Sequence, residues 1–102
     1  MAGAKRSIIW TVSAFKDLQN IVEFISQDST YYGLAFYDDI MNKAQSLIDF
    51  PQRGRIVPEM DDPNLREVFV HRYRLIYQIH PSNIIIKTIV HGARDIFQID
   101  DR

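Results

Sequence analysis

The chain has 102 residues, a length that suits one domain with one modest core. Hydrophobic residues make up 46% and charged residues 25%, which is typical of a globular protein and not of a disordered one. The absence of cysteine excludes disulfides and thiolate metal sites, and the net charge of -1 indicates no particular partner. No signal peptide and no run of ~20 apolar residues is recognisable, so we expect a cytoplasmic protein that does not use membranes.

The first half of the chain predicts one strand and two helices. Residues 7–12 (SIIWTV) are β-branched and aromatic, as is typical of a strand. Ser13 has a side chain that often begins a helix, and apolar residues follow it at helical spacing until about Gln27. Ser29 is the expected start of a second helix, which Pro51 ends because proline cannot continue it. The apolar stripe of this second helix consists of Phe36, Ile40, Ala44, Leu47 and Ile48.

The second half of the chain changes from helical to strand periodicity. Residues 55–65 contain two prolines and predict a loop or an irregular strand. Residues 66–70, 73–80 and 83–91 each predict a strand, and their short connections favour an antiparallel meander. The expected fold is therefore α+β in the order β-α-α-β-β-β, with two N-terminal helices packed on a small antiparallel twisted sheet and residues 1–102 forming one domain.

One segment of the second half is poor in acids. Residues 68–94 contain four bases and all three histidines but no Asp or Glu. If the last hairpin turns at Ser82–Asn83, Arg74 lies directly opposite His91, and opposed residues share a face. Alternation on residues 73–79 directs Tyr73, Leu75, Tyr77 and Ile79 towards the helices. Arg74, Lys87 and His91 would then form a cationic surface on the other face, suited to an anion.

Three residues are candidates for acid–base chemistry on a phosphodiester. Arg74 could clamp a phosphate, although a strand arginine equally often pairs with a carboxylate, here Glu59 or Glu67. His91 could act as a general acid or base near neutral pH, although a histidine at a strand end is more often structural. Glu59 could be a general base facing Arg74, or an ordinary loop carboxylate.

Four further bases are candidates for binding an anion or RNA: Arg55, Arg66, Lys87 and Arg94. Arg55 flanks Gly54 and could instead bond the carbonyls at a helix end, and Arg94 could pair with Asp95. The histidines at 71, 80 and 91 have no metal-ligand spacing, so we expect no metal and no cofactor.

Five segments, in this order, resemble the RelE/ParE superfamily of type II toxins. They are WTVSAFKDLQNIVEFI (Trp10–Ile25), FPQRGRIVPE (Phe50–Glu59), LRE (Leu65–Glu67), YRLIYQI (Tyr73–Ile79) and IVHGARD (Ile89–Asp95). The resemblance runs from about Ile8 to Asp95 and implies the same β-α-α-β-β-β fold. It also implies a toxin that inhibits growth and a cognate antitoxin as protein partner, as in plasmid stabilization systems.

The resemblance implies two alternative targets. RelE-like members are mRNA interferases that cut mRNA on the ribosome without a metal, and Glu59, Arg74 and His91 resemble their loop glutamate, strand arginine and C-terminal histidine. Gly92 stands where those members have a tyrosine, so part of the set is missing. ParE-like members inhibit DNA gyrase and are not nucleases. The helix near Ser13, the HGARD ending and the pI of about 6.3 favour the ParE-like branch. A third alternative is an inactive scaffold that only binds its antitoxin, and we expect no direct DNA binding by the toxin alone.

Overall fold

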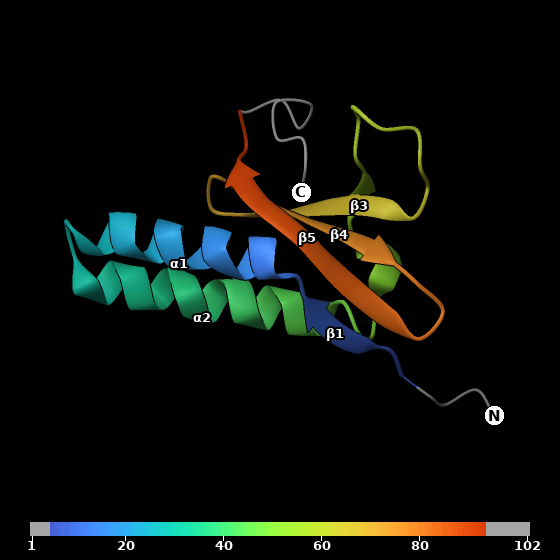
Figure 1. Cartoon of the computed structure of the whole chain (residues 1–102), viewed down its shortest axis with the longest axis horizontal. Helices are drawn as coiled ribbons and strands as arrows, with labels where there is room; N and C mark the ends of the chain where they lie inside the picture. Colours follow the sequence, from blue (N-terminus) through green and yellow to red (C-terminus); the bar gives the residue numbers. More distant parts are fainter. Residues whose placement is uncertain (1–4, 94–102) are drawn as a thin grey trace.

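A computed structural model of the chain describes residues 5–93. The elements follow in the order β1 (Ser7–Trp10), α1 (Val12–Ser26), α2 (Thr30–Ser46), a short 3-10 helix η1 (Pro51–Arg53), β2 (Arg55–Ile56), β3 (Leu65–Val70), β4 (Tyr73–Ile79) and β5 (Asn83–His91). The two helices lie side by side against one face of the sheet, and their connected ends extend beyond it (Figure 1). The predicted order of helices and main strands is confirmed, and β2 is an additional two-residue strand within the expected loop or irregular strand.

The sheet has five strands in the order β1-β5-β4-β3-β2. The predicted meander of β3, β4 and β5 is antiparallel, as expected. β1, however, pairs with β5 in parallel, so the sheet is mixed and not wholly antiparallel. The reason is topological: the helical hairpin carries the chain from one end of β1 across the sheet, and β5 returns in the same direction as β1.

Both helices begin at a hydroxyl side chain. The side chain of Thr11, and not that of Ser13, caps α1 by accepting a hydrogen bond of 3.0 Å from the Ala14 amide. Ser29 caps α2 as predicted, by accepting a bond of 3.2 Å from the Tyr32 amide. The helical hairpin is closely packed at Gly33 of α2, which lies against α1 where a larger residue would meet Ser26.

The main core lies between the helices and the sheet. Residues 73, 75, 77 and 79 of β4 face it, as the alternation predicts. Its buried members are Ala14, Leu18, Phe36, Ile40, Ala44, Leu47, Val70, Leu75, Tyr77, Ile84, Ile86 and Ile89. A second, smaller apolar cluster of Val57, Leu65, Ile76 and Val90 lies apart from it. The successive residues Leu75 and Ile76 of β4 belong to different clusters, so the two clusters lie on opposite faces of this strand.

The predicted register of the last hairpin is wrong. The turn is Pro81–Ser82 and not Ser82–Asn83, because the amide of His80 bonds the carbonyl of Asn83. The displaced turn shifts the pairing by two residues, and the extra residue Lys87 in β5, opposite Ile76 and Tyr77, shifts it back by one, so that Arg74 pairs with Val90. His91 pairs instead with Tyr73. A net shift of one residue changes the face of every side chain that follows it, so Arg74 and His91 lie on opposite faces of the sheet.

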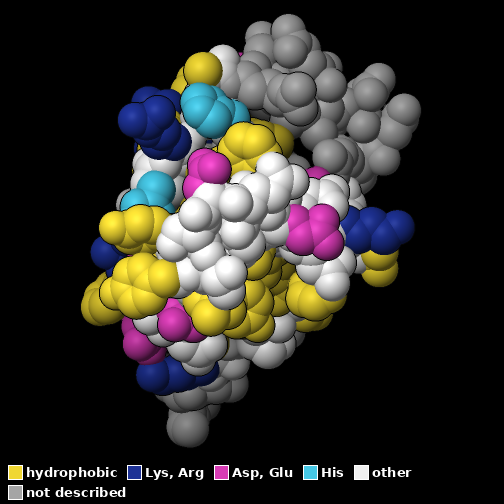
Figure 2. All heavy atoms as spheres, turned by 90° about the vertical axis from the view of Figure 1, so that its left-hand side faces the viewer, with side chains coloured by type: hydrophobic (Ala, Val, Ile, Leu, Met, Phe, Trp, Pro, Cys, Tyr) yellow, Lys and Arg dark blue, Asp and Glu magenta, His cyan; other side chains and the backbone are white. Residues whose placement is uncertain are grey.

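Several large hydrophobic side chains remain at the surface of the helical hairpin. Figure 2 views the molecule from the end where α1 passes into α2, and hydrophobic side chains gather over this end. Phe24, Tyr31, Tyr32 and Leu34 are between 59% and 74% exposed. A patch of this kind on a small protein is typical of a surface that contacts another protein.

Candidate functional site

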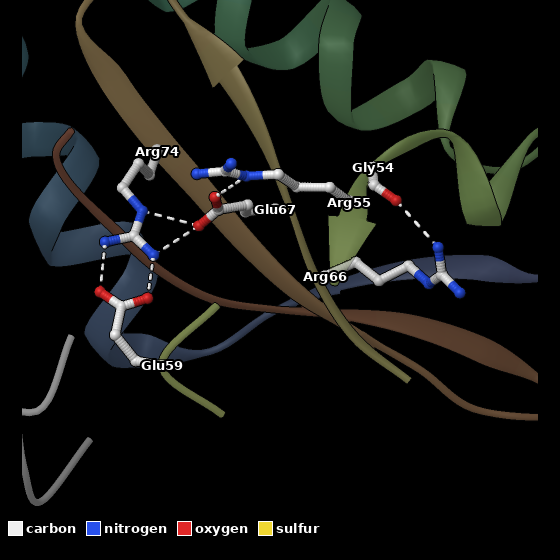
Figure 3. Close-up of polar contacts among 6 residues, drawn as sticks. All are labelled: Gly54, Arg55, Glu59, Arg66, Glu67 and Arg74. Carbon is white, nitrogen blue, oxygen red and sulfur yellow. Dashed lines mark hydrogen bonds and ion pairs between the residues drawn. The ribbon is translucent and has the colours of Figure 1, made fainter. Parts of the chain in front are cut away.

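Arg74 lies in the middle of a cluster of charged side chains on the sheet face opposite the helices (Figure 3). Its side chain is only 4% exposed. The guanidinium donates from Nη1 to Glu59 Oε2 at 3.0 Å and from Nη2 to Glu59 Oε1 at 2.8 Å, which is a bidentate pair. It also donates from Nε to Glu67 Oε1 at 2.7 Å. All three guanidinium nitrogens therefore have a carboxylate partner.

Glu67 connects this pair to a second arginine. Its side chain is completely buried, and its other oxygen, Oε2, accepts a hydrogen bond of 2.5 Å from Nε of the largely exposed Arg55. The Arg55 guanidinium also lies 5.8 Å from the ring centre of Phe69. Glu59, Arg74, Glu67 and Arg55 thus form a continuous chain of alternating charges, which we call the ion chain.

The local sequence explains how the ion chain forms. Glu67 and Arg74 belong to adjacent antiparallel strands and share a face, because Arg74 pairs with Phe69, two residues from Glu67. Glu59 comes from the connection between β2 and β3, which the buried side chain of Val57 holds against the sheet. The charge-assisted hydrogen bonds that Arg74 donates to Glu59 and, secondarily, to Glu67 raise the pKa of Arg74 despite the opposing effect of burial. Arg74 is therefore a permanent cation.

His91 is not part of the ion chain. Its exposed ring packs edge-on against Tyr73, with 5.6 Å between ring centres, on the face that carries the helices. Its Nδ1 accepts a bond of 3.3 Å from the Ala93 amide. The expectation that Arg74 and His91 sit together is wrong, and the structure brings together only two of the three predicted acid–base residues, Glu59 and Arg74.

The predicted anion-binding residues do not form one patch. Arg55 belongs to the ion chain. Arg66 donates a hydrogen bond of 2.9 Å to the Gly54 carbonyl (Figure 3) and another of 2.9 Å to the Pro63 carbonyl. Lys87 lies at the bulge of β5, and its side chain has no hydrogen bond or ion pair within residues 5–93. Arg94 lies outside the described residues. The predicted cationic surface of Arg74, Lys87 and His91 is thus wrong, because Arg74 is enclosed and His91 is on the other face.

The sequence did not predict one polar contact, which joins α1 to the last residues of β5. Asp17 of α1 accepts a hydrogen bond of 2.6 Å from the Thr88 hydroxyl and one of 3.3 Å from the Ile89 amide. Helical periodicity alone places Asp17 on the polar side of α1, and no local signal distinguishes it from a solvent-exposed residue.

The part of the chain that the structure describes shows no group of three or more His, Asp or Glu side chains able to hold a metal ion. Within residues 5–93, neither helix is both long and apolar enough to cross a membrane.

Comparison with known proteins assigns the family. Residues 8–96 match the family of the ParE toxin of the type II toxin-antitoxin system parDE. Toxin RelE2 of Caulobacter vibrioides is 32% identical over 88 residues, which are 85% of this chain and 96% of that protein.

Two solved structures share the fold. One is the chromosomal ParDE system of P. aeruginosa, with a TM-score of 0.71 and 20% identity over 87% of this chain and 98% of that one. The other is the RelBE2 toxin-antitoxin complex of Mycobacterium tuberculosis, with a TM-score of 0.60 and 18% identity over 85% of this chain and 98% of that one. The chain therefore belongs to the ParE toxin family of type II toxin-antitoxin systems, within the RelE/ParE superfamily.

Proposed function

We propose that this toxin inhibits growth in the cytoplasm by binding DNA gyrase in the manner of ParE-like toxins, and that a cognate antitoxin neutralises it. The activity is then binding to a protein and not catalysis. The match to the ParE toxin family over residues 8–96 supports this branch of the superfamily.

The observation that carries the proposal is the enclosure of Arg74. A nuclease of this superfamily needs the strand arginine to contact the scissile phosphate, but here each of its nitrogens already bonds Glu59 or Glu67. Freeing it would leave the buried Glu67 carboxylate without its main partner, which is costly inside a protein. His91 lies on the opposite face and does not contribute to the same site. The net charge of -1 also disfavours tight binding to ribosomal RNA.

The test is a gyrase supercoiling assay run beside a primer-extension assay on translated mRNA. The purified toxin is expected to block supercoiling and to leave the mRNA uncut. His91→Ala is a suitable comparison, because the exposed ring can be removed without opening the core, and we expect it to inhibit gyrase as well as the wild type does. Codon-positioned mRNA cuts that disappear in His91→Ala, with supercoiling unaffected, would contradict the proposal.

A RelE-like ribosome-dependent endoribonuclease is the second candidate, and two observations favour it. The 32% identical relative is named as a RelE toxin. Glu59 also lies beside Arg74, so a carboxylate and an arginine of the kind that acid–base cleavage uses are present on one face of the sheet. If the toxin is such a nuclease, Glu59→Gln and His91→Ala should each abolish mRNA cleavage. The residues that contact RNA would then be Arg55, Arg66, Lys87 and Arg94. A toxin that neither inhibits gyrase nor cuts mRNA would be an inactive scaffold.

A further inference from the structure

The helical hairpin carries a groove of about 430 Å³ on its outer side, which no helix or strand within residues 5–93 covers (Figure 1). The buried side chain of Ala14 marks the side of α1 that faces the core, so helical periodicity directs Gln19 and Glu23 outwards. The groove is lined by Phe15, Leu18, Gln19, Asn20, Val22 and Glu23 of α1 and by Tyr37 of α2.

Apolar side chains of this outer side remain in contact with solvent. Phe15 of α1 is 48% exposed, and Tyr37 of α2 is 39% exposed. Leu34, one turn before Tyr37, is 59% exposed. Gly33 packs against Ser26, which places the start of α2 beside the end of α1. The exposed Leu34 and Tyr37 therefore lie beside the second half of α1, whereas Phe15 belongs to its first half.

The outer side of α1 also carries two charges of opposite sign. Lys16 and Glu23 are both exposed, and neither side chain has a hydrogen bond or ion pair within residues 5–93. Seven residues are about two helical turns, so both side chains lie on the same side of α1, about 10 Å apart along its axis. A helix face with an unpaired cation near one end and an unpaired anion near the other is complementary to an inverted copy of itself.

A two-fold axis that crosses α1 at its middle pairs these charges. It makes α1 of one copy antiparallel to α1 of the other and sets Lys16 of each copy opposite Glu23 of the other, which gives two equivalent ion pairs. The same axis brings Phe15 of each copy towards Leu34 and Tyr37 of the other. One symmetry operation thus covers the apolar side chains and pairs both charges, which favours a second copy of this chain over an unrelated protein as the partner.

We propose that the toxin forms a symmetric dimer through the outer side of its helical hairpin, with a second copy of the chain as the partner. Burial of apolar side chains around Phe15 drives the association, and the two ion pairs between Lys16 and Glu23 set the antiparallel register. The ion chain lies on the sheet face opposite the helices, so the dimer does not cover it. This inference does not depend on which molecule the toxin inhibits.

Sedimentation equilibrium of the purified toxin over a range of concentrations tests the inference, and the wild type should show a monomer–dimer equilibrium. Lys16→Glu and Glu23→Lys should each raise the dissociation constant of the dimer by about tenfold at low salt, because each variant places two pairs of like charges in the interface. The variant with both substitutions has opposite charges across the axis again. Its dissociation constant should return to within about threefold of the wild-type value.

Lys43→Glu is the matched control, because Lys43 is a lysine of α2 that lies on the side facing β3, and this variant should dimerise as the wild type does. Phe15→Ser removes an apolar contact at a half-exposed position. Its monomer should keep the circular dichroism spectrum of the wild type, and its dimer should be weaker by about tenfold.

Two results would overturn the dimer. One is a wild-type toxin that stays monomeric at every concentration, and the other is a dimer that Lys16→Glu weakens no more than Lys43→Glu does. If both single charge reversals weaken the dimer and the double variant does not recover, the two-fold arrangement of α1 is wrong. Each of these results would leave the toxin assignment intact.

Discussion

Arg74 and Glu67 form an ion pair inside the protein, with side chains that are 4% and 0% exposed and a distance of 2.7 Å between Nε and Oε1. Charges in such a position are stable only when they are paired, and Arg74 here pairs with both Glu67 and Glu59. The bidentate bond from Arg74 to Glu59 also attaches the β2–β3 connection to the sheet. The ion chain is thus first a structural element.

Arg74→Ala should lower the free energy of unfolding by about 3–5 kcal/mol, because it leaves the buried Glu67 carboxylate without its main partner. Urea unfolding followed by circular dichroism measures the loss. The control is Arg72→Ala, since Arg72 is exposed and has no polar side-chain partner within residues 5–93, and its effect should stay below about 0.5 kcal/mol. Similar losses for the two variants would show that the ion pair does not stabilise the fold.

Tyr77 predicts how stability changes at alkaline pH. Burial raises the pKa of its phenol, which donates to the Pro51 carbonyl at 2.6 Å and accepts from the Gly54 amide at 3.0 Å. Above pH ~10 an unfolded tyrosine loses its proton while the folded one keeps it, so unfolding releases a proton and the free energy of unfolding falls as pH rises. Below pH ~10 the contribution is fully present.

Tyr77→Phe should therefore show a smaller fall than the wild type between about pH 8 and about pH 11, measured by urea unfolding. At neutral pH it should be less stable by about 1–3 kcal/mol, since the Gly54 amide and Pro51 carbonyl lose their partner. Tyr31→Phe, at a position 74% exposed, should match the wild type at both pH values. If the free energy of unfolding falls equally in Tyr77→Phe and in the wild type, groups other than Tyr77 cause the alkaline loss of stability.

Gly54→Ala should destabilise the protein by about 1–3 kcal/mol. The added methyl group would lie 2.6 Å from the carbonyl oxygen of Glu67 and 2.6 Å from the hydroxyl of Tyr77, and the backbone oxygen cannot move away freely. In Gly33→Ala the methyl group meets first the hydroxyl of Ser26, which can rotate, and the helix gains about 1 kcal/mol of intrinsic propensity. The midpoint temperature of thermal unfolding should be lower for Gly54→Ala than for Gly33→Ala, and the reverse order would contradict the packing argument.

Asp17 and Thr88 should be energetically coupled although 71 residues separate them. Asp17→Ala and Thr88→Val are each expected to cost about 1–3 kcal/mol, because each removes the hydrogen bond from the Thr88 hydroxyl to the Asp17 carboxylate at the junction of α1 and β5. The double variant should lose less than the sum of the two, by at least about 0.5 kcal/mol in a double-mutant cycle. Additive losses would mean that the hydrogen bond contributes nothing to stability.

Much of the fold follows from local patterns. The stripe of residues 36, 40, 44 and 47 predicts α2 because helical residues four apart share a face. Alternation on β4 predicts that Leu75 and Tyr77 face the helices while Arg74 faces away. Sequence reasoning also included the pairing of Arg74 with Glu59 or Glu67 as an alternative to phosphate binding. A carboxylate at Glu67, between the apolar residues Leu65 and Phe69 of the same face, is the local signal that a buried cation is needed.

The sequence by itself determined the order of the elements, the apolar face of each one and the superfamily, because these depend on residues close together along the chain. The tertiary structure alone decided the pairing of β1 with β5 and the separation of Arg74 from His91. A turn displaced by one residue and a bulge of one residue are small local changes, yet strand pairing carries their net shift of one residue to the far end of the hairpin, where it decides the face of each side chain.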